Sequence, residues 1–337
     1  MEAKLAVLWR REKEGIRCNL CARKCLILPG KRGFCMVREN KNNQLYTLNY
    51  GRVVGLNFDP IEKKPLFHFY PGSTALSYAC RGCNWRCQFC CNWLISHDGL
   101  PEIFGDKYEP EEIVEMAQER NCKIISHTYT EPTIYFEFAY EVAKLAHKKG
   151  MLNTFVTNGY MSLQALRKIS KFLDAATVDF KASNDPSFLL KYSSVPSNEP
   201  VFEFLKGLKK YGIHIEITNL IVPQIGENLE QFRKVVKWII ENLGSDVPFH
   251  VLRFHPDYML TEIPVTPIET LESFIEEAKK LGLKHVYIGN VPGHRYENTY
   301  CPNCNELLIE RTGFWVEKVN LEGNKCKKCG EKINIVV

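Results

Sequence analysis

Residues 74–93 read TALSYACRGCNWRCQFCCNW, an apolar run followed by a loop that is rich in cysteine. Within this loop, Cys83, Cys87 and Cys90 have the spacing CxxxCxxC. Three thiolates this close in sequence can bind one 4Fe-4S cluster, which normally takes four cysteine ligands, so one iron would keep an open position for a substrate or cofactor. The stretch therefore predicts a strand that leads directly into a reactive metal centre.

Two alternatives to this assignment remain open. The loop could instead bind structural zinc, or the flanking Cys80 and Cys91 could take part in ligation. Because successive side chains tend to diverge, we expect Cys91 to be a packed or redox-labile thiol. The apolar strand before the loop and the α/β pattern after it favour the catalytic interpretation.

Short β-rich apolar runs alternate with helical patterns through much of the chain. This alternation predicts βαβ units and a parallel sheet. Between the runs, Ile134, Phe138, Val142 and Leu145 recur at helical spacing after Pro132, which suits a first helical turn. The runs are TALSYA (74–79), CKIIS (122–126), NTFVT (153–157), ATVDF (176–180), IEITNLIV (215–222), FHVLRF (249–254) and HVYIG (285–289).

The predicted fold class is therefore α/β, a full or partial (β/α)6 barrel with small metal-bound lobes at its two ends. We expect a cysteine-rich metal-binding extension at residues 1–70, the barrel at 71–298 and a zinc-ribbon-like lobe at 299–337. The apolar and charged fractions, 45% and 25%, are typical of globular proteins.

Charge and hydropathy narrow the function classes. The net charge of +5 is small beside 44 basic and 39 acidic residues, so nucleic acid is not indicated as a partner. No apolar run reaches the roughly 18 residues of a membrane span, and MEAKLAVLWRREKEG at the start lacks the apolar block of a secretory signal. We expect a cytoplasmic protein, in which 14 cysteines indicate metal binding because that compartment keeps most thiols reduced.

Two further cysteine groups flank the barrel pattern. The knuckles CPNC and CKKC near the carboxyl end have zinc-ribbon spacing and predict a structural Zn2+, with a rubredoxin-like iron or an auxiliary cluster as the alternative. The amino-terminal pattern CxxCxxxCx9C fits either Zn2+, as scaffolding, or an auxiliary 4Fe-4S cluster, as an electron relay. The ligands would be Cys301, Cys304, Cys326 and Cys329 in the first group and Cys18, Cys21, Cys25 and Cys35 in the second.

Polar residues stand directly after several predicted strands, where ligands bind in α/β barrels. Taken singly, each has an alternative role as a cap or a solvated charge, and for Thr130 helix capping is the specific alternative. The candidate binding residues are Thr130, Glu131, Thr157, Asn158, Asp179, Lys181 and His255.

The CxxxCxxC loop, with Phe89 before its third cysteine, resembles that of the radical S-adenosylmethionine (SAM) superfamily. TNGY (157–160), DFK (179–181), IVP (221–223) and FHP (254–256) look like the strand ends of pyruvate formate-lyase activating enzymes. Taken as a whole, the chain resembles the AmmeMemoRadiSam-system radical SAM enzyme family. The stretches that carry this second resemblance are RCNLCARKC (17–25), GKRGFC (30–35), DPIEKKPLFHFYPG (59–72), YTEPTIYFEFAY (129–140), VTNGYM (156–161), GNVPGH (289–294) and NTYCPNC (298–304).

This resemblance implies an enzyme that reductively cleaves SAM at the 4Fe-4S cluster, giving methionine and a 5'-deoxyadenosyl radical that abstracts hydrogen from an unknown substrate. A glycine of a partner protein is one candidate substrate, and another protein, a small molecule or RNA is the other. The reaction needs a one-electron reductase or ferredoxin-type donor. A different class of function, a non-catalytic zinc-stapled nucleic-acid or protein adaptor, is the alternative.

The resemblance also implies roles for single residues. Phe89 would pack near the adenine of SAM, and Asp179 and Lys181 would engage its ribose or its methionine carboxylate. His255 would lie over the SAM pocket. Residues 127–133 stand where the superfamily has a glycine-containing element that meets the SAM amino group, but these glycines are absent here, which weakens the assignment of Thr130 and Glu131.

Overall fold

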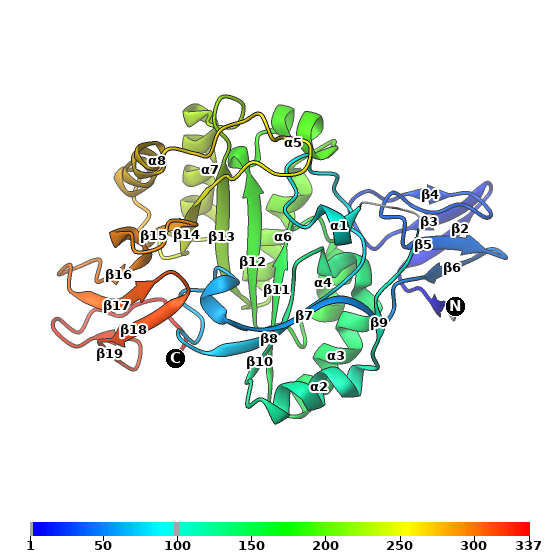
Figure 1. Cartoon of the computed structure of the whole chain (residues 1–337), viewed down its shortest axis with the longest axis horizontal. Helices are drawn as coiled ribbons and strands as arrows, with labels where there is room; N and C mark the ends of the chain where they lie inside the picture. The colour runs from blue at the N-terminus through cyan, green and yellow to red at the C-terminus, as the bar shows by residue number, and fades with distance from the viewer. Residues whose placement is uncertain (1–2, 98–101) are drawn as a thin grey trace. The chain divides into compact units, whose positions relative to one another are not determined.

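The predicted alternation of strands and helices is present in the computed structural model, which describes residues 3–97 and 102–337 and has a mixed α/β fold (Figure 1). The chain packs into two compact units, each built from several segments. The three-part division at residues 70 and 298 stays a prediction. Unit 1 comprises Met1–Asp59, Thr74–Ala176 and Glu199–Ile213, and unit 2 comprises Pro60–Ser73, Thr177–Asn198 and His214–Val337.

Parallel strands β8 (Thr74–Cys80), β10 (Ile124–His127) and β11 (Leu152–Thr157) form the centre of unit 1. Every residue of β10 and all but the first of β8 are buried, as expected for parallel strands that are covered on both faces. The register aligns Ile124 of β10 with Ala75 of β8 and with Leu152 of β11. Because the three strands run in the same direction, their carboxyl ends lie at one edge.

The helices of unit 1 follow the apolar spacing of the sequence. Helix α3 packs on β10 and β11, and α2 packs on α3 (Figure 1). Pro132 begins a 3-10 turn, η2, rather than the α-helix itself, which starts at Phe136. The helices and turn are α1 (Trp93–Ser96), α2 (Pro110–Glu119), η2 (Pro132–Tyr135), α3 (Phe136–Lys148), α4 (Leu163–Ile169) and α6 (Glu199–Lys210).

Short antiparallel strands make up the amino-terminal part of unit 1. They form two small sheets, with the orders β2-β3-β4 and β1-β6-β5, while β7 pairs with β9. The strands are β1 (Lys4–Leu5), β2 (Trp9–Glu12), β3 (Gly15–Cys18), β4 (Leu26–Ile27), β5 (Arg38–Lys41), β6 (Gln44–Thr47), β7 (Arg52–Pro60) and β9 (Asp106–Lys107).

In unit 2, β12, β13, β14 and β15 continue the predicted pattern, and β13, β14 and β15 pair in parallel. Helix α7 buries Phe232, Val235, Val236 and Ile239, as the sequence spacing predicts. The strands are β12 (Ala175–Lys181), β13 (His214–Ile221), β14 (Phe249–Arg253) and β15 (Val286–Gly289). The helices and turns are η1 (Ile61–Lys63), η3 (Ala182–Asn184), α5 (Pro186–Ser193), α7 (Leu229–Asn242), α8 (Ile268–Lys280) and η4 (Arg295–Glu297).

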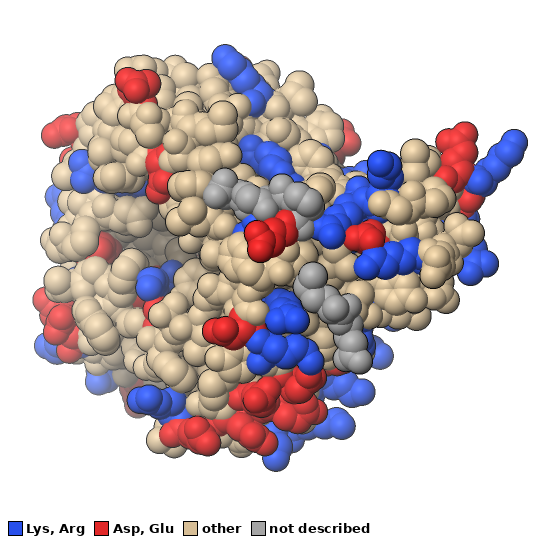
Figure 2. Space-filling view, turned by 45° about the vertical axis from the view of Figure 1, so that its right-hand side comes forward, with Lys and Arg blue, Asp and Glu red and all other residues tan. Residues whose placement is uncertain are grey.

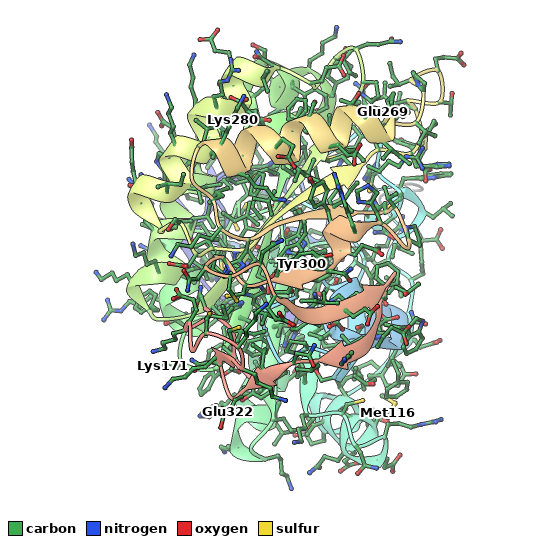
Figure 3. The ribbon with its side chains drawn as sticks, turned by 90° about the vertical axis from the view of Figure 1, so that its left-hand side faces the viewer. Met116, Lys171, Glu269, Lys280, Tyr300 and Glu322 are labelled. Atoms are coloured by element: carbon green, nitrogen blue, oxygen red, sulfur yellow. The ribbon has the colours of Figure 1, made fainter. Side chains whose placement is uncertain are left out.

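The carboxyl-terminal strands of unit 2 form a small lobe with its own core, in which Leu308, Ile309 and Ile333 pack around Cys301 and Cys326. Figure 3 shows Tyr300, at the end of β16, between helix α8 and the strands that follow. These strands are β16 (Thr299–Tyr300), β17 (Leu307–Thr312), β18 (Trp315–Val319), β19 (Leu321–Glu322) and β20 (Lys325–Cys326).

The surface carries charges of both signs. Figure 2 shows Lys and Arg side chains interspersed with Asp and Glu over the visible face, in keeping with the small net charge. In the described ranges, none of the helices has the length and apolar character that a membrane crossing requires.

Candidate functional site

The cysteine loop leaves the carboxyl end of β8 through Gly82. The φ of Gly82 is +104°, a conformation that residues with a Cβ rarely adopt. The backbone N–H of Trp85 donates to Sγ of Cys83 over 3.4 Å, and Sγ of Cys90 lies 3.4 Å from the hydroxyl of Ser96. Cys83, Cys87 and Cys90 are all partly exposed as residues, while burial raises the pKa of the Cys83 thiol.

The two flanking cysteines differ from the motif cysteines and from each other. Cys80 is the last residue of β8 and is fully buried, and burial raises the pKa of its thiol. Cys91 is exposed. The expectation that Cys91 is no ligand stays a prediction.

Glu131 joins the carboxyl ends of β10 and β11. Its carboxylate is fully buried and accepts from the hydroxyl of Thr157 at 2.8 Å and from the backbone N–H of Asn158 at 2.9 Å. It also accepts from the backbone N–H of Thr133 at 3.0 Å and from the Thr133 hydroxyl at 2.5 Å. Burial raises the pKa of Glu131, and these donors act in the opposite direction. The carboxylate thus fixes both strand ends and caps η2.

Thr130 does not cap the following turn, because Glu131 takes that position. The Thr130 hydroxyl instead donates to the backbone oxygen of Cys80 over 2.6 Å. The capping role that the sequence left open for Thr130 is therefore wrong. The side chain connects the end of β8 with the loop after β10.

Asn158 brings the cysteine loop and the end of β11 together. Its side-chain amide donates to Oδ1 of Asn84 over 2.7 Å and lies 3.9 Å from Sγ of Cys83. The side-chain amide nitrogen of Asn84 is buried, and no hydrogen-bond partner for it lies in the part of the chain that is described. Phe89, in the same loop, is 6% exposed. Cys83, Glu131, Thr157 and Asn158 thus form one connected network in unit 1.

Sequence reasoning missed two residues of this region. Asn84 lies inside the CxxxCxxC motif, but asparagine has no assigned role at that position, so only its place in the loop could have drawn attention to it. Tyr129 has a φ of +63°, and its hydroxyl donates to Asp59 over 2.5 Å. A pairing across 70 residues leaves no local sequence signal.

The other predicted binding residues belong to unit 2. Lys181 forms an ion pair with Asp179 at 3.1 Å, and the hydroxyl of Thr218 donates to Asp179 over 2.6 Å. Both members of the pair are partly exposed. His255 is exposed, and its Nδ1 lies 3.0 Å from the backbone oxygen of Pro256. Asp179 and Lys181 therefore form one local site. The contact described for His255 is with the adjacent residue, Pro256.

The amino-terminal cysteines converge on one cavity of unit 1. Besides the four thiols, Asn84 and the buried Arg38 line this cavity. Burial raises the pKa of the Cys35 thiol to about 11. The cysteines that line the cavity are Cys18, Cys21, Cys25 and Cys35.

The carboxyl-terminal cysteines form a tighter group in unit 2. Sγ of Cys301 lies 3.6 Å from that of Cys329, and Sγ of Cys304 lies 3.7 Å from that of Cys326. Tetrahedral zinc with Zn–S bonds of about 2.3 Å places its sulfurs about 3.8 Å apart. The four thiols therefore fit a tetrahedral metal ion.

This group is unique in its spacing among the residues described. No other group of three or more Cys, His, Asp or Glu side chains in residues 3–97 and 102–337 has all its ligand atoms within 4.8 Å. Cys83, Cys87 and Cys90 are therefore not all within 4.8 Å of one another. In a 4Fe-4S cluster each thiolate binds a different iron atom, so the sulfurs need not converge on one ion.

Comparisons with known proteins identify relatives of this chain. A model of the radical SAM superfamily matches residues 78–239, which contain the cysteine loop and Glu131. Over 217 residues, the chain is 24% identical to the pyruvate formate-lyase-activating enzyme of Clostridium pasteurianum, covering 58% of this chain and 88% of that protein. The crystal structure of a radical SAM methyltransferase from Sphaerobacter thermophilus shares the fold, with a TM-score of 0.51 at 14% identity over 66% of this chain and 68% of that one.

One relative matches almost the full chain. It is the uncharacterized protein MJ0808 of Methanocaldococcus jannaschii, 49% identical over 324 residues, which are 96% of this chain and 96% of that protein. Proteins of the radical SAM superfamily use SAM and a 4Fe-4S cluster as cofactors. The chain therefore contains a radical SAM superfamily domain and belongs to one family with MJ0808.

Proposed function

We propose that this protein is a radical SAM enzyme whose 4Fe-4S cluster is held by Cys83, Cys87 and Cys90. The observation that carries the proposal is the three-cysteine loop at the carboxyl end of β8, inside the matched superfamily domain. When bound, the cluster supplies the electron that cleaves SAM to methionine and a 5'-deoxyadenosyl radical. A ferredoxin-type one-electron donor provides that electron.

Two of the predicted SAM contacts take a revised role. The acceptors of Glu131 are occupied by Thr133, Thr157 and Asn158, and the Thr130 hydroxyl donates to the backbone of Cys80. We assign both as positioning residues, which hold the strand ends around the cysteine loop. Asn158, which reaches Cys83 and Asn84, is the better candidate for contact with bound SAM.

Phe89, Thr157, Asp179, Lys181 and His255 keep their proposed roles as SAM-binding residues. The Asp179–Lys181 pair presents one acceptor and one donor group at a strand end. A carboxylate can accept from the ribose hydroxyls, and an ammonium group can neutralise the methionine carboxylate. We propose that the four cysteines at the carboxyl end, whose spacing fits a tetrahedral ion, hold a structural Zn2+.

The substrate is proposed by class. The similarity to a pyruvate formate-lyase-activating enzyme supports hydrogen abstraction from a glycine of a partner protein. The identity of 24% covers 58% of the chain, so radical modification of another protein, a small molecule or RNA is the second candidate.

The test is anaerobic reconstitution with iron and sulfide, followed by addition of SAM and a strong one-electron reductant. The product measured is 5'-deoxyadenosine, separated by chromatography. Wild-type protein should form it, and a triple variant with Cys83→Ala, Cys87→Ala and Cys90→Ala should not. Cys122→Ala is a matched control, because Cys122 lies outside the three cysteine groups.

If wild-type protein yields no 5'-deoxyadenosine and SAM leaves the paramagnetic spectrum of the cluster unchanged, the proposal is wrong. A colourless protein that binds zinc in this loop would then support the adaptor function.

A further inference from the structure

We propose that Cys18, Cys21, Cys25 and Cys35 hold a second iron–sulfur cluster of the 4Fe-4S type, directly beside the loop that carries Cys83. The sequence leaves zinc and a cluster equally open at these four cysteines. The buried cation that faces these cysteines indicates a bound metal centre, and the spacing of the sulfurs and the contacts with the central loop favour the cluster.

The spacing of the sulfurs is the first argument. All four cysteines line the same cavity, so one group bound there could reach all of them. Yet no three of them lie within 4.8 Å of one another, since the carboxyl-terminal set is the one such group in the described residues. One zinc ion holds its sulfurs about 3.8 Å apart. A cubane cluster spreads its four thiolates over four iron atoms and therefore requires the wider spacing.

The buried cation is the second argument. Arg38 lines the cavity, is 1% exposed and donates from Nη1 to Sγ of Cys18 over 3.9 Å. It forms a buried ion pair with Glu137, yet its Nε has no hydrogen-bond partner among the described residues. An unpartnered N–H of a buried guanidinium is costly unless an acceptor is present. The thiolate sulfurs of a bound metal centre, whether zinc or a cluster, would supply that acceptor, so this contact indicates that the site is built to hold a metal.

The close packing of the two cysteine motifs is the third argument. A Cβ built on Gly82, the residue before Cys83, would lie 3.2 Å from the backbone oxygen of Cys35. Arg23, inside the amino-terminal motif, donates to the backbone oxygen of Asn84, and Asn84 itself lines the amino-terminal cavity. The residue next to Cys83 is therefore part of the wall of the second site.

The strand end at Asn158 meets the same motif. The backbone N–H of Ala22 donates to the oxygen of Tyr160 over 3.0 Å, and Cys21 forms a β-bridge with Met161. Asn158, two residues before Tyr160, contacts both Asn84 and Cys83. One short hydrogen-bonded path thus connects the two cysteine sites.

This position gives the second cluster a redox role, which rests on the proposed function of the central loop. A ferredoxin-type donor is oxidised by one electron as it reduces the amino-terminal cluster. The same electron then passes to the central cluster, and the amino-terminal cluster returns to its oxidised state. A zinc ion has no accessible second oxidation state and could not take this part.

The experiment measures metals in the full-length protein after anaerobic reconstitution with 57Fe and sulfide. Iron, sulfide and zinc are quantified per chain, and the iron is typed by Mössbauer spectroscopy. Wild-type protein should bind about eight iron atoms as two 4Fe-4S clusters and about one zinc. The triple variant Cys83→Ala, Cys87→Ala and Cys90→Ala should keep about four iron atoms in a 4Fe-4S cluster.

A second variant, Cys21→Ala with Cys35→Ala, should lose the iron of the amino-terminal cluster and keep the iron of the central cluster. Cys122→Ala should keep both clusters. In the reduced wild-type protein and in Cys122→Ala, magnetic interaction between neighbouring clusters should broaden the electron paramagnetic resonance signal. The triple variant and the Cys21→Ala, Cys35→Ala variant should each show a simple, uncoupled spectrum.

The outcomes separate this proposal from the proposed function. If the triple variant binds no iron, or binds a second zinc in its place, the amino-terminal cluster is disproved while the central site stands. If the variant with Cys21→Ala and Cys35→Ala binds no iron, the assignment of a cluster to the central loop fails instead. Unchanged far-ultraviolet circular dichroism in both variants would show that the chain is folded.

Discussion

Each of the two outer sites has four cysteine side chains, but the spacing of the sulfurs differs between them. The carboxyl-terminal sulfurs pair at 3.6 Å and 3.7 Å, a spacing set by two short knuckles in a small lobe. The amino-terminal sulfurs line a cavity without any three of them, in the described structure, coming within 4.8 Å. The comparison teaches that four cysteines can be held at different spacings by different folds, and we propose that this spacing selects the metal.

The residues that pack around the two sites also differ. The carboxyl-terminal cysteines pack with Leu308, Ile309 and Ile333 in a lobe with few other core residues, so a bound ion would contribute much of its stability. The amino-terminal cysteines contact the central loop and the buried Arg38–Glu137 pair. The first geometry is suited to stapling a short tail, and the second to a redox site.

The largest expected effect is on the carboxyl-terminal lobe. Cys326→Ala should abolish zinc binding and unfold residues 299–337, because zinc binding in small domains contributes about 10–16 kcal/mol of folding free energy. Hydrogen exchange would detect the loss of protection in that segment, while iron content stays unchanged. A lobe that remains protected without zinc would contradict the stapling role.

The next effect concerns the buried ion pair of the amino-terminal site. Arg38→Met should lower the free energy of unfolding by about 3–5 kcal/mol, since it leaves Glu137 as an unpaired buried charge. Urea titration measures this change. The double variant Arg38→Met with Glu137→Leu should recover much of the lost stability, but it should still bind iron more weakly than wild type if Arg38 faces a cluster.

A smaller effect is expected at the contact between the central and amino-terminal motifs. Gly82→Ala should cost about 1–3 kcal/mol of stability and reduce iron loading, because its Cβ would lie 2.8 Å from Cγ1 of Val37 at a strained φ. Gly150→Ala is the matched control, with a φ of +73° and open space around its Cβ. Equal iron loading in the two variants would show that the close packing is unimportant for the clusters.

The smallest effect is expected at Cys91, the exposed thiol beside the central motif. Cys91→Ala should change the free energy of unfolding by no more than about 0.5 kcal/mol, as is usual for surface positions. Iron, sulfide and zinc contents should equal those of wild type. Loss of the central cluster in this variant would overturn the assignment of Cys83, Cys87 and Cys90.

The amino-acid sequence by itself predicted the seven strands, the α/β class and the three cysteine groups. These features are local: apolar periodicity sets strands and helices, and the cysteine groups are recognised from the spacing of their short motifs. The CxxxCxxC loop after the first of these strands was likewise recognisable from spacing alone.

The tertiary structure decided the features that depend on distant residues. Arg38 and Glu137 pair across 99 positions, and Asn158 reaches Asn84 across 74. Packing also decided that Glu131 fixes strand ends and that Thr130 caps no helix. The spacing of the amino-terminal sulfurs is of the same kind, because the separation of side chains on different turns follows from how those turns pack and not from their order in the chain.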